Sequence, residues 1–204
     1  EELPAGRPLR TTPVYEIMLS EGAQMGCSFG LEVPLWFAPK GVTDKFSWRR
    51  STDFEHVAEE VRAVREGVGV LEISGFAKYT VVGSGASDWL DQILACRIPK
   101  PGRMTLAPML NENGKLIGDF TLANLDDDEF FIAGSGIAEE YHLRWFEQHL
   151  PESANLEVIP HRADILGLSI AGAKSRELLT KITDEDVSRE AFTFMDIHEM
   201  NIGM

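Results

Sequence analysis

The chain has 204 residues, of which 44% are hydrophobic and 25% are charged, and its formal net charge is −14. This content can bury a core as one domain or as two compact subdomains, which argues against disorder. The negative charge argues against nucleic-acid or anionic-membrane partners, because the long-range field repels polyanions.

The two cysteines and the hydropathy of the chain narrow the possible classes of protein further. Cys27 and Cys96 have neither a disulfide framework nor histidines at zinc-ligand spacing around them, so no metal site is expected. No run approaches the roughly 20 apolar residues that span a bilayer. We therefore expect a cytoplasmic protein, or one of the mitochondrial matrix if its source is eukaryotic.

The first third of the chain predicts two helices and two irregular segments. Residues 1–14 are punctuated by proline, carry Arg7 and Arg10, and show no core-building periodicity, so they are expected to be a linker that packs against another domain. Helices are expected over residues 15–21 and over residues 53–68, where apolar side chains recur at helical spacing. Residues 38–51 lack such periodicity and are expected to form a surface loop.

One pattern recurs three times along the chain: an apolar strand, a small-residue turn and an amphipathic helix. The copies cover residues 79–94, 130–150 and 166–182. The segments between them resemble further strands and hairpins. We therefore predict an α+β fold of duplicated strand-turn-helix units, with helices packed on antiparallel or mixed sheets.

Residues 102–122 predict a hairpin that carries one carboxylate, Asp119, in an apolar arm. Asn113-Gly114 is a turn dipeptide that tolerates positive φ at both central positions. Leu116, Ile117, Phe120 and Leu122 are expected to serve the core. An ionised Asp119 among them would have to face a cavity, a cation or a buried donor. The alternative is that Asp119 is a solvent-facing strand residue or a turn acceptor.

The end of the chain predicts a further hairpin or strand pair over residues 192–204. An unpaired terminal strand is a poor way to finish a domain. We therefore expect the chain to be a fragment of a longer module.

The order of segments resembles one known family along nearly the whole chain. The matching segments are residues 5–16, 22–23, 29–37, 59–74, 102–122, 130–136 and 140–146. They resemble the aminomethyltransferase family, meaning the glycine-cleavage T-protein and the folate-binding portion of dimethylglycine and sarcosine dehydrogenases. Residues 130–136 and 140–146 are more similar to the dehydrogenase branch.

The resemblance implies a domain organisation and a cofactor. Residues 15–204 correspond to the N-terminal portion of a folate-binding domain, and residues 1–14 to a linker from an upstream flavin domain. The family continues after the equivalent of Met204 with a Tyr-Thr-Gly-Glu motif and a long C-terminal portion. Tetrahydrofolate is the implied cofactor of this chain, whereas FAD would belong to the upstream domain.

The resemblance also implies site residues. Asp119 matches the family's catalytic aspartate, and Phe76, Leu106, Thr121 and Ser135 match positions that line the folate cavity. T-proteins typically have Met, Tyr, a small aliphatic residue and Asn at these four positions. The missing tyrosine hydroxyl and asparagine amide imply weaker or differently arranged pterin recognition.

The function implied is folate-dependent one-carbon capture in a flavin-dependent N-demethylating dehydrogenase. Its substrate would be dimethylglycine, sarcosine or a related N-methyl amine, which the flavin oxidises to an iminium. Two alternatives stay open: a T-protein-like aminomethyltransferase of the glycine cleavage system, and a non-catalytic folate-binding or scaffold module.

Overall fold

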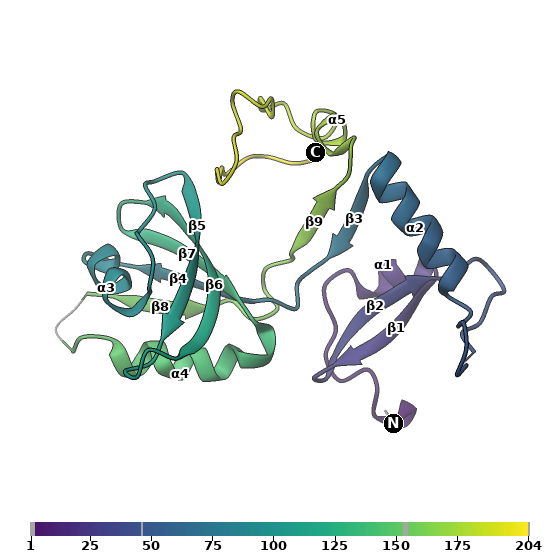
Figure 1. Cartoon of the computed structure of the whole chain (residues 1–204), viewed down its shortest axis with the longest axis horizontal. Coiled ribbons are helices and arrows are strands. Elements are labelled where there is room, and N and C mark those ends of the chain that lie inside the picture. The colour runs from purple at the N-terminus through teal and green to yellow at the C-terminus, as the bar shows by residue number, and fades with distance from the viewer. Residues whose placement is uncertain (1–2, 46, 153–154, 204) are drawn as a thin grey trace. The chain divides into compact units, whose positions relative to one another are not determined.

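The structure is a computed structural model that describes residues 3–45, 47–152 and 155–203 (Figure 1). Backbone contacts divide the chain into two compact units. Unit 1 comprises residues 1–75 and 166–182, and unit 2 comprises residues 76–165 and 183–204. No helix in the described part of the chain is long and apolar enough to cross a membrane.

Unit 1 is built from two small antiparallel sheets with short helices beside them. Its elements are η1 (Pro4–Gly6), α1 (Tyr15–Ser20), β1 (Ala23–Ser28), β2 (Leu31–Phe37), α2 (Phe54–Glu66), β3 (Gly69–Glu72), β9 (Leu168–Ala171) and α5 (Ser175–Leu179). Strand β1 pairs with β2, and β3 pairs with β9. Helices α1 and α2 confirm the two helices predicted from apolar spacing.

The lead-in segment, expected to be a linker, contacts unit 1 itself. Arg7 donates to both carboxylate oxygens of Glu32, at 2.8 and 2.6 Å, and to the Met25 carbonyl at 3.0 Å. Arg10 donates to the Phe29 carbonyl at 2.8 Å. Glu32 is only 2% exposed, and the hydrogen bonds from Arg7 hold its pKa below the usual value. Both arginines are therefore engaged within this unit.

Unit 2 is a five-stranded antiparallel sheet in the order β5-β6-β7-β4-β8. Its elements are β4 (Ala77–Val82), α3 (Ala86–Ile93), β5 (Arg103–Leu110), β6 (Leu116–Asp126), β7 (Glu129–Gly134), η2 (Gly136–Ala138), α4 (Glu139–His149) and β8 (Glu157–Pro160). Figure 1 shows α4 running beside this sheet. The observed architecture confirms the predicted α+β class.

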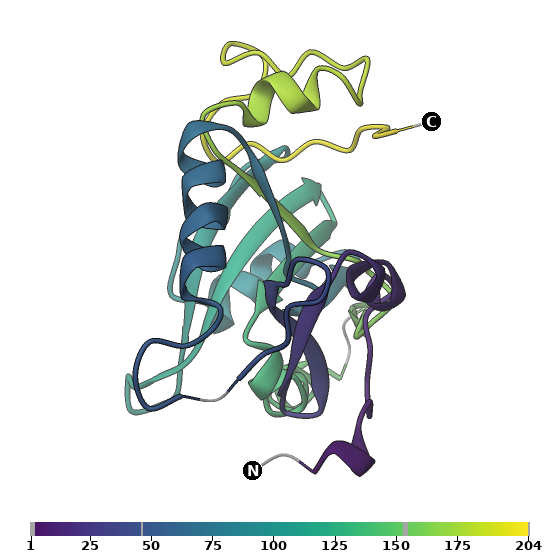
Figure 2. The same cartoon turned by 90° about the vertical axis from the view of Figure 1, so that its right-hand side faces the viewer.

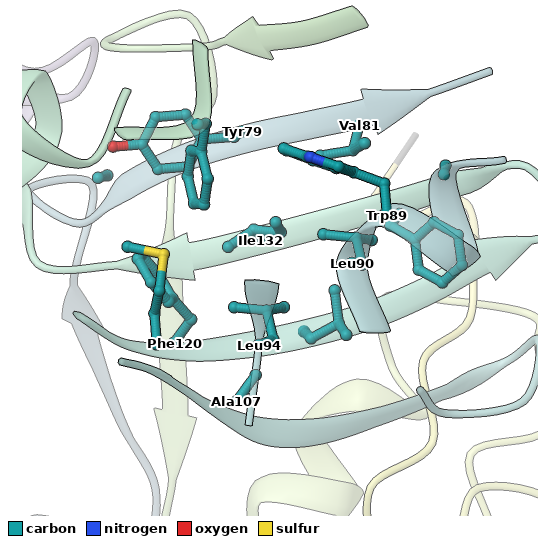
Figure 3. Packing of buried hydrophobic residues seen from close by; sticks show 14 of the residues in the cluster. Tyr79, Val81, Trp89, Leu90, Leu94, Ala107, Phe120 and Ile132 are labelled. Carbon is teal, nitrogen blue, oxygen red and sulfur yellow. The ribbon is translucent and has the colours of Figure 1, made fainter. Parts of the chain in front are cut away.

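The core of unit 2 lies on one face of this sheet, which we call the inner face. Trp89 and Leu90 of α3 and Phe146 of α4 pack there against buried strand residues such as Tyr79 and Ile132 (Figure 3). The Tyr79 hydroxyl donates to the Glu139 carbonyl at 2.8 Å, and the Trp89 indole donates to the His149 carbonyl at 2.7 Å. Since Glu139 and His149 are the first and last residues of α4, these bonds anchor both ends of the helix.

The three predicted strand-turn-helix units are all present, as β4–α3, β7–α4 and β9–α5. The predicted hairpin is also present, as β5–β6, but its turn differs from the expected one. Only Gly114 has a positive φ, +70°, in a longer loop over residues 111–115. The Asn111 side chain accepts from the backbone N–H groups of Asn113 and Lys115, and these bonds close the loop.

The predicted strand pair at the end of the chain is wrong. Residues 183–203 contain no named helix or strand, and the yellow segment in Figure 2 follows an irregular path. Met195 has a φ of +64°, which interrupts an extended run, and Phe194 is 86% exposed, so an alternating pattern has no core to face. One isolated bridge, Arg103 to Asp196, joins the segment to the start of β5.

Candidate functional site

The strands of unit 2 separate their side chains onto two faces. Phe120 and Leu122 of β6 are 2% and 0% exposed and belong to the core on the inner face. Asp119 and Thr121 alternate with them, so they lie on the opposite face, which we call the outer face. Unlike the inner face, it is not covered by α3 or α4.

Three of the five residues singled out from the sequence, Leu106, Asp119 and Thr121, lie within strands on this outer face. Leu106 of β5 pairs directly with Thr121 of β6, and directly opposed residues share a face. Phe76 and Ser135 flank the pair formed by Ala77 and Gly134 at the end of the β4–β7 ladder. Ala77 is in the inner core and a Cβ on Gly134 would meet the inner-face Phe120 ring, and Phe76 and Ser135 are the next residues beyond these two strand ends.

The outer face and these adjoining strand ends are partly apolar and partly polar. Leu106 is 65% exposed and Phe76 is 51% exposed, so two large apolar side chains are open to solvent. Asp119 and Ser135 are exposed, and Thr121 is half-buried. Together they therefore offer apolar contact area, one carboxylate and two hydroxyl groups.

The environment of Asp119 differs from the one expected from the apolar pattern. Its side chain is exposed and takes part in no hydrogen bond or ion pair within the described residues. Leu116, expected in the core, is 62% exposed, because a β-bulge follows it and shifts the alternation of β6. The expectation of a desolvated carboxylate is thus wrong, and the alternative of a solvent-facing strand residue describes its surroundings in this chain.

Three further polar groups on the same side of the sheet were missed from the sequence. Lys78 is only 4% exposed, pairs with Ala133 of the outer face, and donates to the Phe76 carbonyl at 2.9 Å. Thr80 and His161 form a side-chain hydrogen bond of 2.6 Å. The signal available for Lys78 was a charged residue inside a strand whose other residues, apart from Thr80, are apolar or aromatic.

A cavity of about 500 Å³ opens near the β6–β7 turn. Its walls are Leu125, Asp126, Glu129, Phe131, Ile197, His198 and Glu199. None of the five sequence-predicted residues lines it. The described residues contain no group of three or more His, Cys, Asp or Glu side chains placed to bind a metal ion.

Arg103, the first residue of β5, has a charged partner in the chain. It forms an ion pair with Asp196 and donates to the Thr193 hydroxyl at 3.0 Å. Hydrogen bonds from Thr193 hold the pKa of Asp196 below its usual value, and Arg103 adds to this effect. The charge of Arg103 is therefore largely compensated at the start of β5.

Comparison with known proteins places this geometry in a family. Residues 14–204 match the model of the GCVT N-terminal domain. Dimethylglycine dehydrogenase of Mus musculus, a mitochondrial protein, is 35% identical over 100% of the chain and 24% of its own length. The mitochondrial pyruvate dehydrogenase phosphatase regulatory subunit of Mus musculus is 25% identical over 97% of the chain and 24% of its own length.

A solved structure shows the same fold. The glycine cleavage system aminomethyltransferase T from Bartonella henselae superposes with a TM-score of 0.74 at 21% identity, covering 92% of this chain and 46% of that protein. The chain spans about a quarter of the length of the dehydrogenase that it matches. The resemblance noted from the sequence is confirmed, and the chain belongs to the GCVT N-terminal domain family.

Proposed function

We propose that the chain is the reduced-folate-binding part of a flavin-dependent N-demethylating dehydrogenase, and that the outer face of unit 2 receives the folate. The 35% identity to dimethylglycine dehydrogenase along the whole chain supports this assignment. One observation carries the proposal. Leu106, Asp119 and Thr121 lie on one face of one sheet, and Phe76 and Ser135 adjoin the same sheet at one end of the β4–β7 ladder.

These side chains fit a flat, partly polar ring system. The exposed apolar surfaces of Leu106 and Phe76 suit contact with a planar heterocycle, and the hydroxyl groups of Thr121 and Ser135 can donate or accept hydrogen bonds at its edge. Reduced folate supplies the amine nitrogens that take up a one-carbon unit, while the protein supplies position and electrostatics.

Asp119 is the candidate on this face for acting on protons or charge in the one-carbon transfer. As a carboxylate it can accept a proton from an amine, or stabilise positive charge that develops beside it. General acid–base catalysis by one positioned side chain contributes roughly 10² to 10⁴ in rate. Because Asp119 is exposed in this chain, we infer that bound ligand removes it from solvent and strengthens its electrostatic effect.

The remaining parts of the reaction lie outside this chain in the proposal. FAD bound by an upstream domain of the same polypeptide would oxidise dimethylglycine, sarcosine or a related N-methyl amine to an iminium. Residues 1–14 would lead from that domain, and residues 15–204 would form the first part of the folate domain. By analogy with the mitochondrial relatives, a eukaryotic source would place the protein in the mitochondrial matrix.

A second candidate is a folate-binding or scaffold module without chemistry. The similarity to a phosphatase regulatory subunit over 97% of the chain favours it. The two candidates differ in one outcome, because a module without chemistry would bind ligand on the outer face but would not depend on the Asp119 carboxylate for one-carbon transfer.

Calorimetric titration of the native gene product with tetrahydrofolate tests the site. Leu106→Glu places a charge on the outer face and should weaken binding at least about tenfold, since it costs apolar contact and repels an anionic ligand. Leu35→Glu is the matched control, because Leu35 is similarly exposed, at 63%, but belongs to β2 of unit 1. Equal affinities of the two variants would contradict the proposed site.

A further inference from the structure

Strand β6 contains an extra residue just before Asp119. Met109 pairs with Gly118 and Leu110 pairs with Leu116, so Ile117 has no partner on β5. Such a β-bulge reorients the side chains that follow it, and a bulge that moves along a strand changes the face on which they lie. A bulge that moved from Ile117 past Asp119 would therefore turn the Asp119 side chain to the inner face.

A buried histidine holds the backbone of this bulge from the inner face. His142 of α4 is 2% exposed, and its Nε2 lies 2.8 Å from the Ile117 carbonyl oxygen. A carbonyl can only accept, so Nε2 carries the proton and Nδ1 has the free lone pair. Burial lowers the pKa of His142, which favours the neutral ring.

The Nδ1 atom of His142 lowers the stability of the fold. It is buried and has no hydrogen-bond partner among the described residues. A buried polar atom without a partner destabilises a fold, so an apolar side chain would suit this position better unless the Nε2 bond served a purpose. Within the described part of the chain, the one hydrogen bond of the ring goes to the bulged residue, Ile117.

The same histidine packs against the residue on the other side of Asp119. The rings of Phe120 and His142 meet edge to face, with centroids 4.8 Å apart. The Phe120 ring also lies over two glycines, since a Cβ on Gly118 or Gly134 would come within 2.4 Å of it. His142 and Phe120 thus hold the backbone on both sides of Asp119 from the inner face.

We propose that His142 is a positioning residue for Asp119, which fixes the bulge at Ile117 so that the carboxylate is presented on the outer face. The inference rests on the proposed function, because it assigns His142 a role toward the same site. His142 lies on the opposite side of the sheet from the outer face, so it acts through β6 and does not touch the ligand.

Two variants of the native gene product separate positioning from packing. His142→Phe keeps an aromatic ring but removes the donor to Ile117, whereas His142→Gln keeps a donor at a position close to Nε2. Misplacement of a reacting group by about 1 Å can cost 10²-fold in rate. We expect His142→Phe to lower kcat of folate-coupled one-carbon transfer about 10- to 100-fold with little change in KM. For His142→Gln, we expect the decrease in the logarithm of kcat to be at most half of the decrease in His142→Phe.

Amide hydrogen exchange gives a readout that does not depend on activity. In His142→Phe the amides of residues 117–119 should exchange at least about tenfold faster, while those of β4 stay within about twofold of the wild type. Unchanged exchange at residues 117–119 would overturn the positioning role, as would a His142→Gln variant no better than His142→Phe. If exchange accelerates but one-carbon transfer is unchanged, the His142–Ile117 hydrogen bond stabilises the bulge, but His142 does not position Asp119 for the reaction. If instead Asp119→Asn itself leaves transfer unchanged, the proposed function fails.

Discussion

Leu106 of β5 and Thr121 of β6 are direct partners in an antiparallel ladder, and both side chains lie on the outer face of unit 2. By the resemblance to T-proteins, which typically carry a tyrosine where this chain has Leu106, the pair has the Thr121 hydroxyl but lacks the tyrosine hydroxyl. The consequence can be tested by restoring that group.

Leu106→Tyr should increase affinity for tetrahydrofolate. A new hydrogen bond contributes about 0.5–1.5 kcal/mol, which corresponds to roughly two- to tenfold in affinity. Leu106→Phe is the control, since it adds the ring without the hydroxyl. Calorimetry that gives the same affinity for both variants would argue against a polar ligand edge at this position.

Arg7 should stabilise unit 1 through Glu32. Arg7→Met leaves the buried Glu32 carboxylate without its main donor, and an unsatisfied buried group costs about 1–3 kcal/mol. Arg10→Met is the matched control, because the exposed Arg10 side chain donates to no group but the Phe29 carbonyl among the described residues. Hydrogen exchange over residues 23–37 should accelerate in the first variant only. Equal acceleration in both variants would show that the Arg7–Glu32 pair contributes no more to the stability of unit 1 than the Arg10–Phe29 hydrogen bond does.

The same pair predicts a pH dependence. Arg7 lowers the pKa of Glu32 in the folded protein below the value of about 4.3 expected for an unfolded chain. The ionised group therefore stabilises the fold above that pH, and the contribution is lost as the pH falls through the folded pKa. In urea unfolding, the stability difference between wild type and Glu32→Gln should be constant above about pH 5 and shrink at lower pH. A difference that does not change with pH would contradict this assignment.

Gly134 should resist even the smallest side chain. A Cβ there would lie 2.4 Å from the Phe120 ring, which is buried in the core, so Gly134→Ala should destabilise unit 2 by about 1–3 kcal/mol. Gly6→Ala is the control, because no atom lies within 4 Å of the added Cβ. Thermal unfolding of Gly134→Ala combined with Phe120→Leu should recover part of the loss. No recovery would mean that the clash is not with the ring.

Local signals in the sequence predicted much of this fold. The Asn113-Gly114 dipeptide identified the β5–β6 hairpin, and alternating apolar runs followed by small residues identified the three strand-turn-helix units. Such features depend on a few adjacent residues. The turn conformation was mispredicted because the Asn111 side chain closes the loop, and that contact is not visible in the dipeptide alone.

The features that decide the site depend on pairing between distant segments. The outer-face position of Asp119 follows from its alternation with the buried Phe120 and Leu122, and the exposure of Leu116 follows from the bulge at Ile117, which is defined only by the register with β5. His142 is 25 residues from Ile117 in the sequence, so nothing in the local pattern connects them. The resemblance to a known family supplied the five proposed site residues, whereas the apolar pattern around Asp119 led to the wrong environment.

The half-reactions of the native gene product test the central claim most directly. In Asp119→Asn, flavin reduction by the N-methyl amine should stay within about twofold of wild type, whereas folate-coupled one-carbon transfer should fall roughly 10²- to 10⁴-fold and more free formaldehyde should be released per turnover. Asp127→Asn, in the β6–β7 turn, is the matched control and should leave both rates unchanged. Equal loss of both half-reactions in Asp119→Asn, or loss of neither, would contradict the assignment of Asp119 and of the outer face.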